Sequence, residues 1–232
     1  MSLPPPTAAA GLTVLFVDNH LLVVDKPAGL LTQSAEPGDD NLLDRGRAWV
    51  KGEFDKPGQV FLGLVHRLDR NVSGVVLFAR TSKAASRLSD AFRTRAIDKT
   101  YLAVVAGVAP RFGALEHPLL EQDRGVVVDP RGKVARLTFR RLAATGGASL
   151  LEITLLTGRK HQIRAQLAVA GHPLVGDPRY GGRSPLIARP ALHASRLAFE
   201  HPVRREPLTF AAPLPADLAA LIADLGLRWP GV

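Results

Sequence analysis

Residues 135–171 read ARLTFRRLAATGGASLLEITLLTGRKHQIRAQLAVAG, and this stretch decides the fold class. Its first part holds two strand-like runs, 135–143 and 148–156, on either side of a Gly-Gly turn, which predicts a long β-hairpin. The remainder starts as a Gly-containing turn and predicts a helix from about His161, which Gly171 ends. Strands followed by a helix, without regular alternation of the two, favour an α+β fold.

Working outward from this hairpin, most other runs are also typical of strands. Upstream strands are expected at 11–18, 21–27, 75–80 and 99–107, the first two joined by a tight turn at Asn19-His20. Downstream, LHASRLAFEHP and PLTFAAP supply two more. Helices are expected from a Ser82 cap to about Arg95 and over 217–227, and the polar segment 34–60 is expected to hold loop and a short helix.

The composition points to a polyanionic partner. The 232-residue chain has a formal net charge of +9 and a pI near 10.6. Each Lys or Arg placed on a phosphate releases condensed counterions, so this balance favours nucleic acid. Solubility alone explains the same charge, since net charge bears on association and not on fold. The absence of cysteine excludes a disulfide framework, thiolate metal sites and a cysteine nucleophile.

The ends and the hydropathy pattern suit a cytoplasmic protein. The start, MSLPPPTAAAG, lacks the basic and apolar regions of a signal peptide, and residues 1–12 are expected to form a disordered tail. No run approaches the ~18 apolar residues that a membrane span requires. We expect no membrane partner and, as the simplest oligomeric state, a monomer.

Asp69 is the first candidate for chemistry. In GLVHRLDRNVSGVVLFAR (63–80) it lies between Arg67 and Arg70, just before a Ser-Gly turn and a buried strand. Neighbouring cations favour the ionised form of a carboxyl group, which would then be available as a nucleophile. Taken alone, the segment equally suits a turn with solvated ion pairs.

Two further segments combine polar side chains with apolar surroundings. Tyr101 lies early in the strand IDKTYLAVVAG (97–107), where its ring suits stacking on a nucleobase and equally suits a half-buried core position. Arg159 and Lys160 precede the helix that carries His161 and Arg164, and a basic helix N-terminus favours an anion. A capped surface helix with basic ends is the alternative.

Taken together, these segments resemble a known family. HRLDRNVSG, IDKTYLAVV, TGRKHQIRAQLAVAGHPLVGDPRYGG and LHASRLAFEHP, in this order and spacing, closely resemble the RluA-type pseudouridine synthases. VDKPAGLLTQS and EPLTFAAPLPADL extend the similarity to about residues 13–220. The resemblance implies a pseudouridine synthase fold with a central, mixed but mostly antiparallel sheet, flanking helices and an active site in a basic cleft.

The resemblance also implies roles for single residues. Asp69 corresponds to the nucleophile, Tyr101 to the stacking tyrosine, and Arg164, next to Ile163, to the arginine that pairs with the nucleophile. Arg67 corresponds to the residue that enters the RNA stack in place of the extruded uridine. The residues expected to contact the RNA substrate are Arg67, Arg70, Lys99, Arg159, Lys160, His161 and Ile163.

The sequence departs from the family at Asn71-Val72, where an acidic residue and Thr are more common. This puts the hydrogen bonds of the local loop in doubt and leaves the catalytic residues unchanged. The catalytic domain is expected over 13–232, without an S4-like module, because the first 12 residues are too few to form one. The substrate is expected to be ribosomal or transfer RNA.

The implied reaction moves the glycosidic bond of uridine from N1 to C5 without oxidation or hydrolysis. It therefore needs neither a redox cofactor nor a metal, and none is expected. Two alternatives stay open: an inactive RNA-binding module with the same basic surface, and a hydrolase that uses His66 or His161 with a carboxylate. No GxSxG motif or metal-ligand spacing supports the hydrolase.

Overall fold

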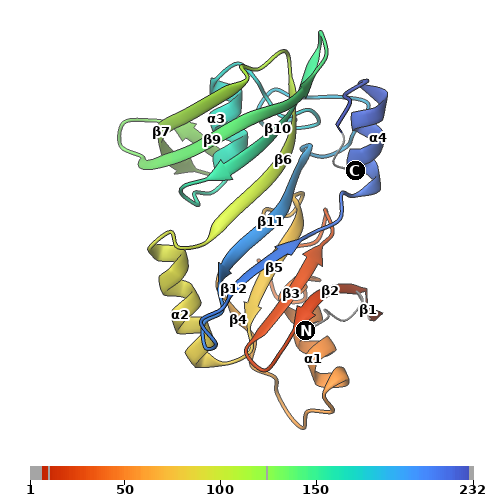
Figure 1. The fold of residues 1–232 in the computed structure, drawn as a ribbon, viewed down its shortest axis with the longest axis vertical. Helices are drawn as coiled ribbons and strands as arrows, with labels where there is room; N and C mark the ends of the chain where they lie inside the picture. Colours follow the sequence, from red (N-terminus) through yellow and green to blue (C-terminus); the bar gives the residue numbers. More distant parts are fainter. Residues whose placement is uncertain (1–6, 10, 124, 230–232) are drawn as a thin grey trace. The chain divides into compact units, whose positions relative to one another are not determined.

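The computed structural model describes residues 7–9, 11–123 and 125–229. They fall into two compact units (Figure 1). Unit 1 is Met1–Ile97 with Arg196–Pro213, and unit 2 is Asp98–Ser195 with Leu214–Val232. Residues 1–6 and 10 of the predicted tail lie outside the described residues, whereas Thr7–Ala9 form strand β1.

The sheet of unit 1 is built from antiparallel neighbours. Its strand order is β1, β2 (Leu12–Val17), β3 (Leu21–Lys26) and β5 (Ser73–Ala79). β4 (Gly63–Leu64) also pairs with β5, and β12 (Pro207–Ala211) pairs with the end of β11 (Leu192–Glu200). The predicted hairpin of β2 and β3 and the predicted strand at 75–80 are confirmed.

The turn between β2 and β3 is held by Asp18. Its Oδ1 atom accepts hydrogen bonds from the backbone N–H groups of His20, at 2.8 Å, and Leu21, at 2.7 Å. A carboxylate that closes a turn in this way replaces backbone hydrogen bonds that the reversal of the chain removes. The sequence Asp-Asn-His is thus suited to the tight reversal that the hairpin requires.

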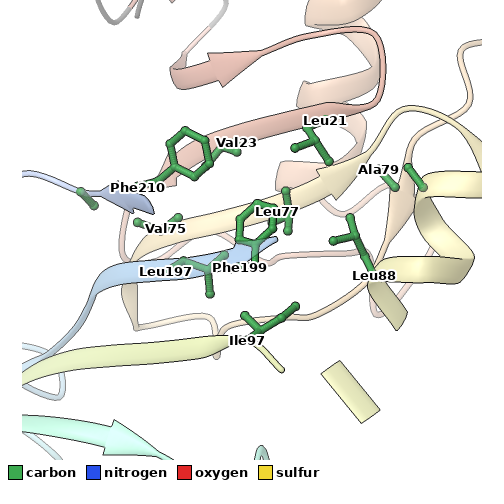
Figure 2. Packing of buried hydrophobic residues seen from close by; sticks show 12 residues of the cluster. Leu21, Val23, Val75, Leu77, Ala79, Leu88, Ile97, Leu197, Phe199 and Phe210 are labelled. Atoms are coloured by element: carbon green, nitrogen blue, oxygen red, sulfur yellow. The ribbon is translucent and has the colours of Figure 1, made fainter. Parts of the chain in front are cut away.

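The core of unit 1 lies on β3, β5 and α2 (Ser82–Arg93), which packs against β5 and β4. Every residue of β5 is buried, as expected for a strand covered on both faces. Figure 2 shows this cluster, in which apolar side chains of β3 and β5 meet those of α2, β11 and β12. Its labelled members include Leu21, Val23, Leu77, Leu88, Phe199 and Phe210.

Both helices of unit 1 begin at a side-chain cap. Asn41 caps α1 (Leu42–Glu53), the short helix expected within 34–60. The cap of α2 is Thr81 and not Ser82 as predicted: Thr81 has extended backbone angles and accepts from Ala84 N at 3.2 Å, whereas Ser82 is already helical. A cap residue must keep a non-helical backbone to reach the first free N–H groups.

Unit 2 contains an antiparallel sheet with long strands. The order is β6 (Asp98–Ala106), β10 (Ala148–Leu155), β9 (Lys133–Ala144), β7 (Phe112–Gln122) and β8 (Gly125–Val128). The predicted hairpin around the Gly-Gly turn is confirmed as β9 and β10. β7 and β8 were not among the expected strands.

Helices complete unit 2. α3 (Gln162–Val169) packs against β7 and β8 through Ala165, and α4 (Ala216–Asp224) buries Leu218 and Leu221 with Leu150 of β10. The four helices and the mostly antiparallel strand pairing confirm the predicted α+β class. None of the helices within the described ranges combines the length and the apolar composition needed to cross a membrane.

Candidate active site

Asp69 lies on a loop between β4 and β5 whose backbone is tied down next to it. The residue is partly buried, and its carbonyl accepts from Val72 N at 3.0 Å, which closes a turn. The carbonyl of Arg70 accepts from Gly29 N at 2.8 Å, and Arg70 Nε donates to Gly29 O at 2.9 Å. This reciprocal pair attaches the residue after Asp69 to the segment that follows β3.

Lys26 lies beneath the same loop and is completely buried. Its ammonium donates to the carbonyls of Pro27 at 2.9 Å, Leu30 at 2.7 Å and Arg70 at 3.0 Å. An ammonium has three donors and is costly to bury unless they are satisfied, so three converging carbonyls make this position tolerable. Lys26 therefore joins the segment after β3 to the Asp69 loop.

The residue on the other side of Asp69 is fixed as well. The Thr32 hydroxyl donates to Leu68 O at 2.8 Å and accepts from Leu68 N at 3.2 Å, and Thr32 is buried. Both neighbours of Asp69 are thus held by residues between 26 and 32. Lys26 and Thr32 were not among the residues expected from the sequence; the available signal was the charged pair Asp25-Lys26 at the end of an apolar strand.

His66 has a structural role within the described part of unit 1. Its Nε2 atom accepts the backbone N–H of Leu77 at 2.9 Å, and its ring stacks on Phe92 with 4.7 Å between the centroids. A nitrogen that accepts a hydrogen bond from a strand is engaged in the fold and is poorly placed to act as a base. His66 is therefore a poor candidate for the catalytic base of the hydrolase alternative. Arg67 and Arg70 are exposed.

The strand register in unit 2 determines which side chains neighbour Tyr101. It faces Ile153 of β10, which faces Phe139 of β9, which faces Gly113 of β7. A Cβ atom on Gly113 would lie 2.3 Å from the Phe139 ring, so the ring occupies the space above this glycine. Tyr101 is 8% exposed, so most of its side chain is packed among these cross-strand neighbours.

Arg164 lies on α3 and forms a buried ion pair with Asp177. Its Nε donates to Asp177 Oδ2 at 2.7 Å and its Nη2 to Oδ1 at 2.9 Å. The Arg164 side chain is 10% exposed, and that of Asp177 is fully buried. The sequence reading did not identify Asp177. The implied pairing of Arg164 with Asp69 stays a prediction.

Tyr180 packs beside this ion pair. Its ring centre lies 5.2 Å from the guanidinium carbon of Arg164, within cation–π range. The Tyr180 hydroxyl accepts from Val126 N at 3.0 Å and lies 2.9 Å from His161 Nδ1. Burial raises the pKa of Tyr180, partly countered by the hydrogen bond from Val126 and by Arg164, so the hydroxyl stays protonated at neutral pH.

The turn before α3 is fixed by buried polar side chains. Gln162 Oε1 accepts from the Thr157 hydroxyl at 2.7 Å and from Arg159 N at 3.0 Å, while its amide donates to Arg136 O at 2.9 Å. His161, just before the helix, has a left-handed backbone with φ 49°. The structure thus starts α3 one residue after the predicted position.

The predicted RNA-contacting residues of unit 2 lie around this turn. The exposed Arg159 donates to Val134 O at 3.3 Å, and Lys160 pairs with Glu121 at 3.4 Å. A Cβ atom on Gly158 would lie 3.5 Å from Lys99 Nζ, which places this lysine at the same turn. Ile163 is 3% exposed and belongs to the interior. Lys99, Arg159 and Lys160 therefore form a basic group on unit 2.

Searches among known proteins returned a consistent result. The model of a family described as RNA pseudouridylate synthase matches residues 20–169. An "Uncharacterized RNA pseudouridine synthase YhcT" of Bacillus subtilis is 37% identical over 90% of this chain and 71% of its own length. "Ribosomal large subunit pseudouridine synthase D" of Zymomonas mobilis is 36% identical, and that of Nitrosomonas europaea 37%, each over 92% of this chain.

The chain spans 73% of the Zymomonas protein and 65% of the Nitrosomonas protein. Among solved structures, human RNA Pseudouridylate Synthase Domain Containing 4 has a TM-score of 0.79 and 25% identity, with 94% of each chain covered. Human RNA Pseudouridylate Synthase Domain Containing 1 has a TM-score of 0.72 at 24% identity, a likeness of fold.

Proposed function

The chain belongs to the RNA pseudouridylate synthase family, whose members are isomerases, and we propose that it uses the Asp69 carboxylate as nucleophile to convert specific uridines in structured RNA to pseudouridine. In this proposal, residues 13–232 form the catalytic domain.

The observation that carries the nucleophile assignment is the fixation of the Asp69 loop. Lys26 and Thr32 hold the residues on both sides of Asp69, while Asp69 as a residue is only partly buried. A nucleophile works best when its backbone is rigid and its functional group remains accessible. Solvated ion pairs on a surface turn would not need a buried lysine to organise three carbonyls.

The reaction conserves atoms and electrons. The N1–C1′ bond of uridine breaks, the uracil turns, a C5–C1′ bond forms, and the hydrogen on C5 leaves as a proton while N1 gains one. Asp69 assists departure of the base, either by adding to the base or by acting at the sugar, and any covalent bond that Asp69 forms is broken again before the pseudouridine leaves the site. The C5 proton then passes to a base, and the Tyr101 hydroxyl is a candidate for relaying it.

The target uridine has to leave its stack before Asp69 can reach it, at a cost of a few kcal/mol. We propose that Arg67, an exposed guanidinium two residues before Asp69, stacks in the vacated space. Tyr101 would stack on the extruded uracil. Arg164 would orient Asp69.

The substrate proposed first is ribosomal RNA of the large subunit. Several relatives carry the name of a large-subunit pseudouridine synthase, and the net charge of +9 suits a long polyanion. The basic group of Lys99, Arg159 and Lys160, with Arg70, would contact the phosphates. Transfer RNA is the alternative. Pseudouridine mapping of total RNA with and without the gene distinguishes the two and identifies the position.

The decisive test is Asp69→Asn, measured by tritium release from RNA labelled at C5 of uridine. We expect at least a 1000-fold loss of rate, because an amide cannot act as the nucleophile, with RNA binding within about twofold of wild type. Asp90→Asn, on the exposed face of α2, is the matched control and should retain full activity.

Turnover by Asp69→Asn close to the wild-type rate would refute the nucleophile assignment. A wild-type protein that binds RNA and releases no tritium from any RNA tested would favour the alternative, an inactive RNA-binding module. Tyr101→Phe addresses a narrower point, since an unchanged rate would exclude the hydroxyl from proton transfer and spare the stacking role.

A further inference from the structure

Asp177 is fully buried and takes part in three hydrogen bonds in addition to those from Arg164. Its Oδ1 atom also accepts from Arg179 N at 3.2 Å. Its backbone N–H donates to Leu174 O at 3.2 Å, and its carbonyl accepts from Gly182 N at 2.8 Å. The carboxylate is therefore held at both the backbone and the side chain, and it has little freedom to follow a moving partner.

The loop that carries Asp177 is shaped by two glycines that accept no other residue. A Cβ atom on Gly176 would lie 2.2 Å from Arg189 O, and one on Gly182 would lie 1.8 Å from Leu174 O. Both are backbone atoms, so neither contact can be relieved by turning a side chain. Gly176 also has a left-handed φ of 77°. The tight path of this loop brings Asp177 to one edge of the Arg164 guanidinium.

Tyr180, three residues further on, restrains the face of the same guanidinium. Its ring is anchored at the hydroxyl by Val126 N of β8 and by the contact with His161 Nδ1. The hydroxyl accepts from Val126 N, and the direction of its hydrogen bond with His161 Nδ1 depends on which imidazole nitrogen carries the proton. The plane and the direction of the Arg164 guanidinium are thus both determined within unit 2.

The energetics argue against a purely stabilising role. A buried ion pair contributes little net stability compared with apolar side chains of the same volume, because desolvation offsets the attraction. The pairing uses the Nε–Nη2 edge of Arg164, so Asp177 fixes the direction in which the Nη1 edge points. A fixed cation matters where charge must be stabilised without reorganisation.

We propose that Asp177 is the positioning residue of Arg164: it fixes the guanidinium, with Tyr180 beneath it, in the one orientation in which Arg164 serves the reaction. This inference rests on the proposed function, in which Arg164 acts at the site. Asp177 contacts neither the substrate nor the reacting atoms, and its effect on the rate passes entirely through Arg164.

The test is a double-mutant cycle of Asp177→Asn and Arg164→Met, in which tritium release is measured both in the steady state and in single turnovers. Asp177→Asn alone should lower kcat by about 100-fold with KM nearly unchanged, the loss typical of a misplacement near 1 Å. In the Arg164→Met background, Asp177→Asn should change kcat by less than about twofold, because its target is absent.

The matched control is Asp217→Asn. Asp217 forms the same kind of bidentate pair with Arg189, at 2.6 and 2.8 Å, in the same unit, and has no part in the proposed site. It should leave kcat unchanged. Should Asp177→Asn fail to fold, as judged by circular dichroism, the cycle is run with Asp177→Glu. This variant keeps the charge and should lower kcat only when Arg164 is present.

Two results would overturn the proposal: a kcat within threefold of wild type for folded Asp177→Asn, or the same fold-loss from this substitution with and without Arg164. Failure of the nucleophile assignment is detected separately, since it appears as activity in Asp69→Asn and leaves the coupling between Asp177 and Arg164 measurable.

Discussion

In each unit a buried cation belongs to the proposed site: Lys26 lies beside the Asp69 loop in unit 1, and Arg164 is itself a predicted catalytic residue in unit 2. The two cations are held differently. In unit 1, the Lys26 ammonium donates to three main-chain carbonyls. In unit 2, the Arg164 guanidinium pairs edge-on with the carboxylate of Asp177. Both cations carry one positive charge, and the two sites differ in the charge of the partners, neutral carbonyls against a carboxylate, and in geometry.

The geometry explains what each cation organises. An ammonium is compact, and its three donors can gather carbonyls from separate stretches of backbone, so Lys26 shapes a loop. A guanidinium is planar and matches one carboxylate as a fork, so Asp177 shapes the direction of Arg164. Removing the Lys26 ammonium should therefore lower mainly the free energy of unfolding. Altering the Arg164 guanidinium should lower mainly the reaction rate.

The largest effect is expected for Lys26→Met. Three carbonyls that lose a charged donor inside the protein should cost about 4 kcal/mol of unfolding free energy, within the range for breaking a buried charged network. Urea denaturation measures this loss. Lys51→Met, at an exposed position of α1, is the control and should be near neutral. A loss of less than about 1 kcal/mol would show that the hydrogen bonds from Lys26 to the three carbonyls do not hold the loop.

Arg164→Lys should show the opposite balance. The lysine keeps the charge next to Asp177 and loses the planar fork, so we expect a fall in kcat of about 100-fold and a stability loss near 1 kcal/mol. Single-turnover assays and urea denaturation of the same preparation give both numbers. A rate close to wild type would mean that the charge alone is sufficient and that the planar fork of Arg164 does not matter for the rate.

The smallest effect is expected at Asp25, next to Lys26. Burial raises the pKa of Asp25 to about 6, with the charge of Lys26 opposing the shift. The folded state then binds this proton more tightly than the unfolded chain does. Ionisation consequently lowers stability as the pH rises from about 4 to 6, and the cost is complete above that range.

Asp25→Asn should accordingly stabilise the protein by about 1 kcal/mol at pH 7.5, a value reduced for solvent screening of a partly exposed group. The gain should vanish near pH 4, where the wild-type carboxyl is also neutral. Denaturation midpoints at both pH values test this. Equal midpoints of variant and wild type at pH 7.5 would indicate that Lys26 compensates the carboxylate fully.

Local patterns were sufficient for most elements. The Asp-Asn-His turn between β2 and β3, the Gly-Gly turn between β9 and β10, and Gly171 after α3 each mark a place where the backbone must reverse or stop. Such residues act within a few positions of the chain, so their effect can be read without the fold. The family resemblance added the expected roles of Asp69, Tyr101 and Arg164, which stay predictions.

β7 shows where local patterns fail. Its sequence FGALEHPLLEQ contains Pro118, which argues against a central strand, and its residues alternate only between exposed and partly exposed over most of its length. β8 pairs with β7 only from Leu119 onward, so Pro118 lies where β9 is the sole partner among the described strands. The strand exists because β9 supplies a register, which no local signal encodes.

By itself, the sequence determined the α+β class, the turns, most strands and helices, and the family with its expected catalytic residues. The tertiary structure decided which polar groups meet in the interior. Lys26 meets Arg70 O across 44 residues, and Arg164 meets Asp177 across 13. A buried charge has to find its partners wherever the chain brings them, and desolvation makes that choice stringent, so the partner is a property of the fold and not of the neighbouring residues.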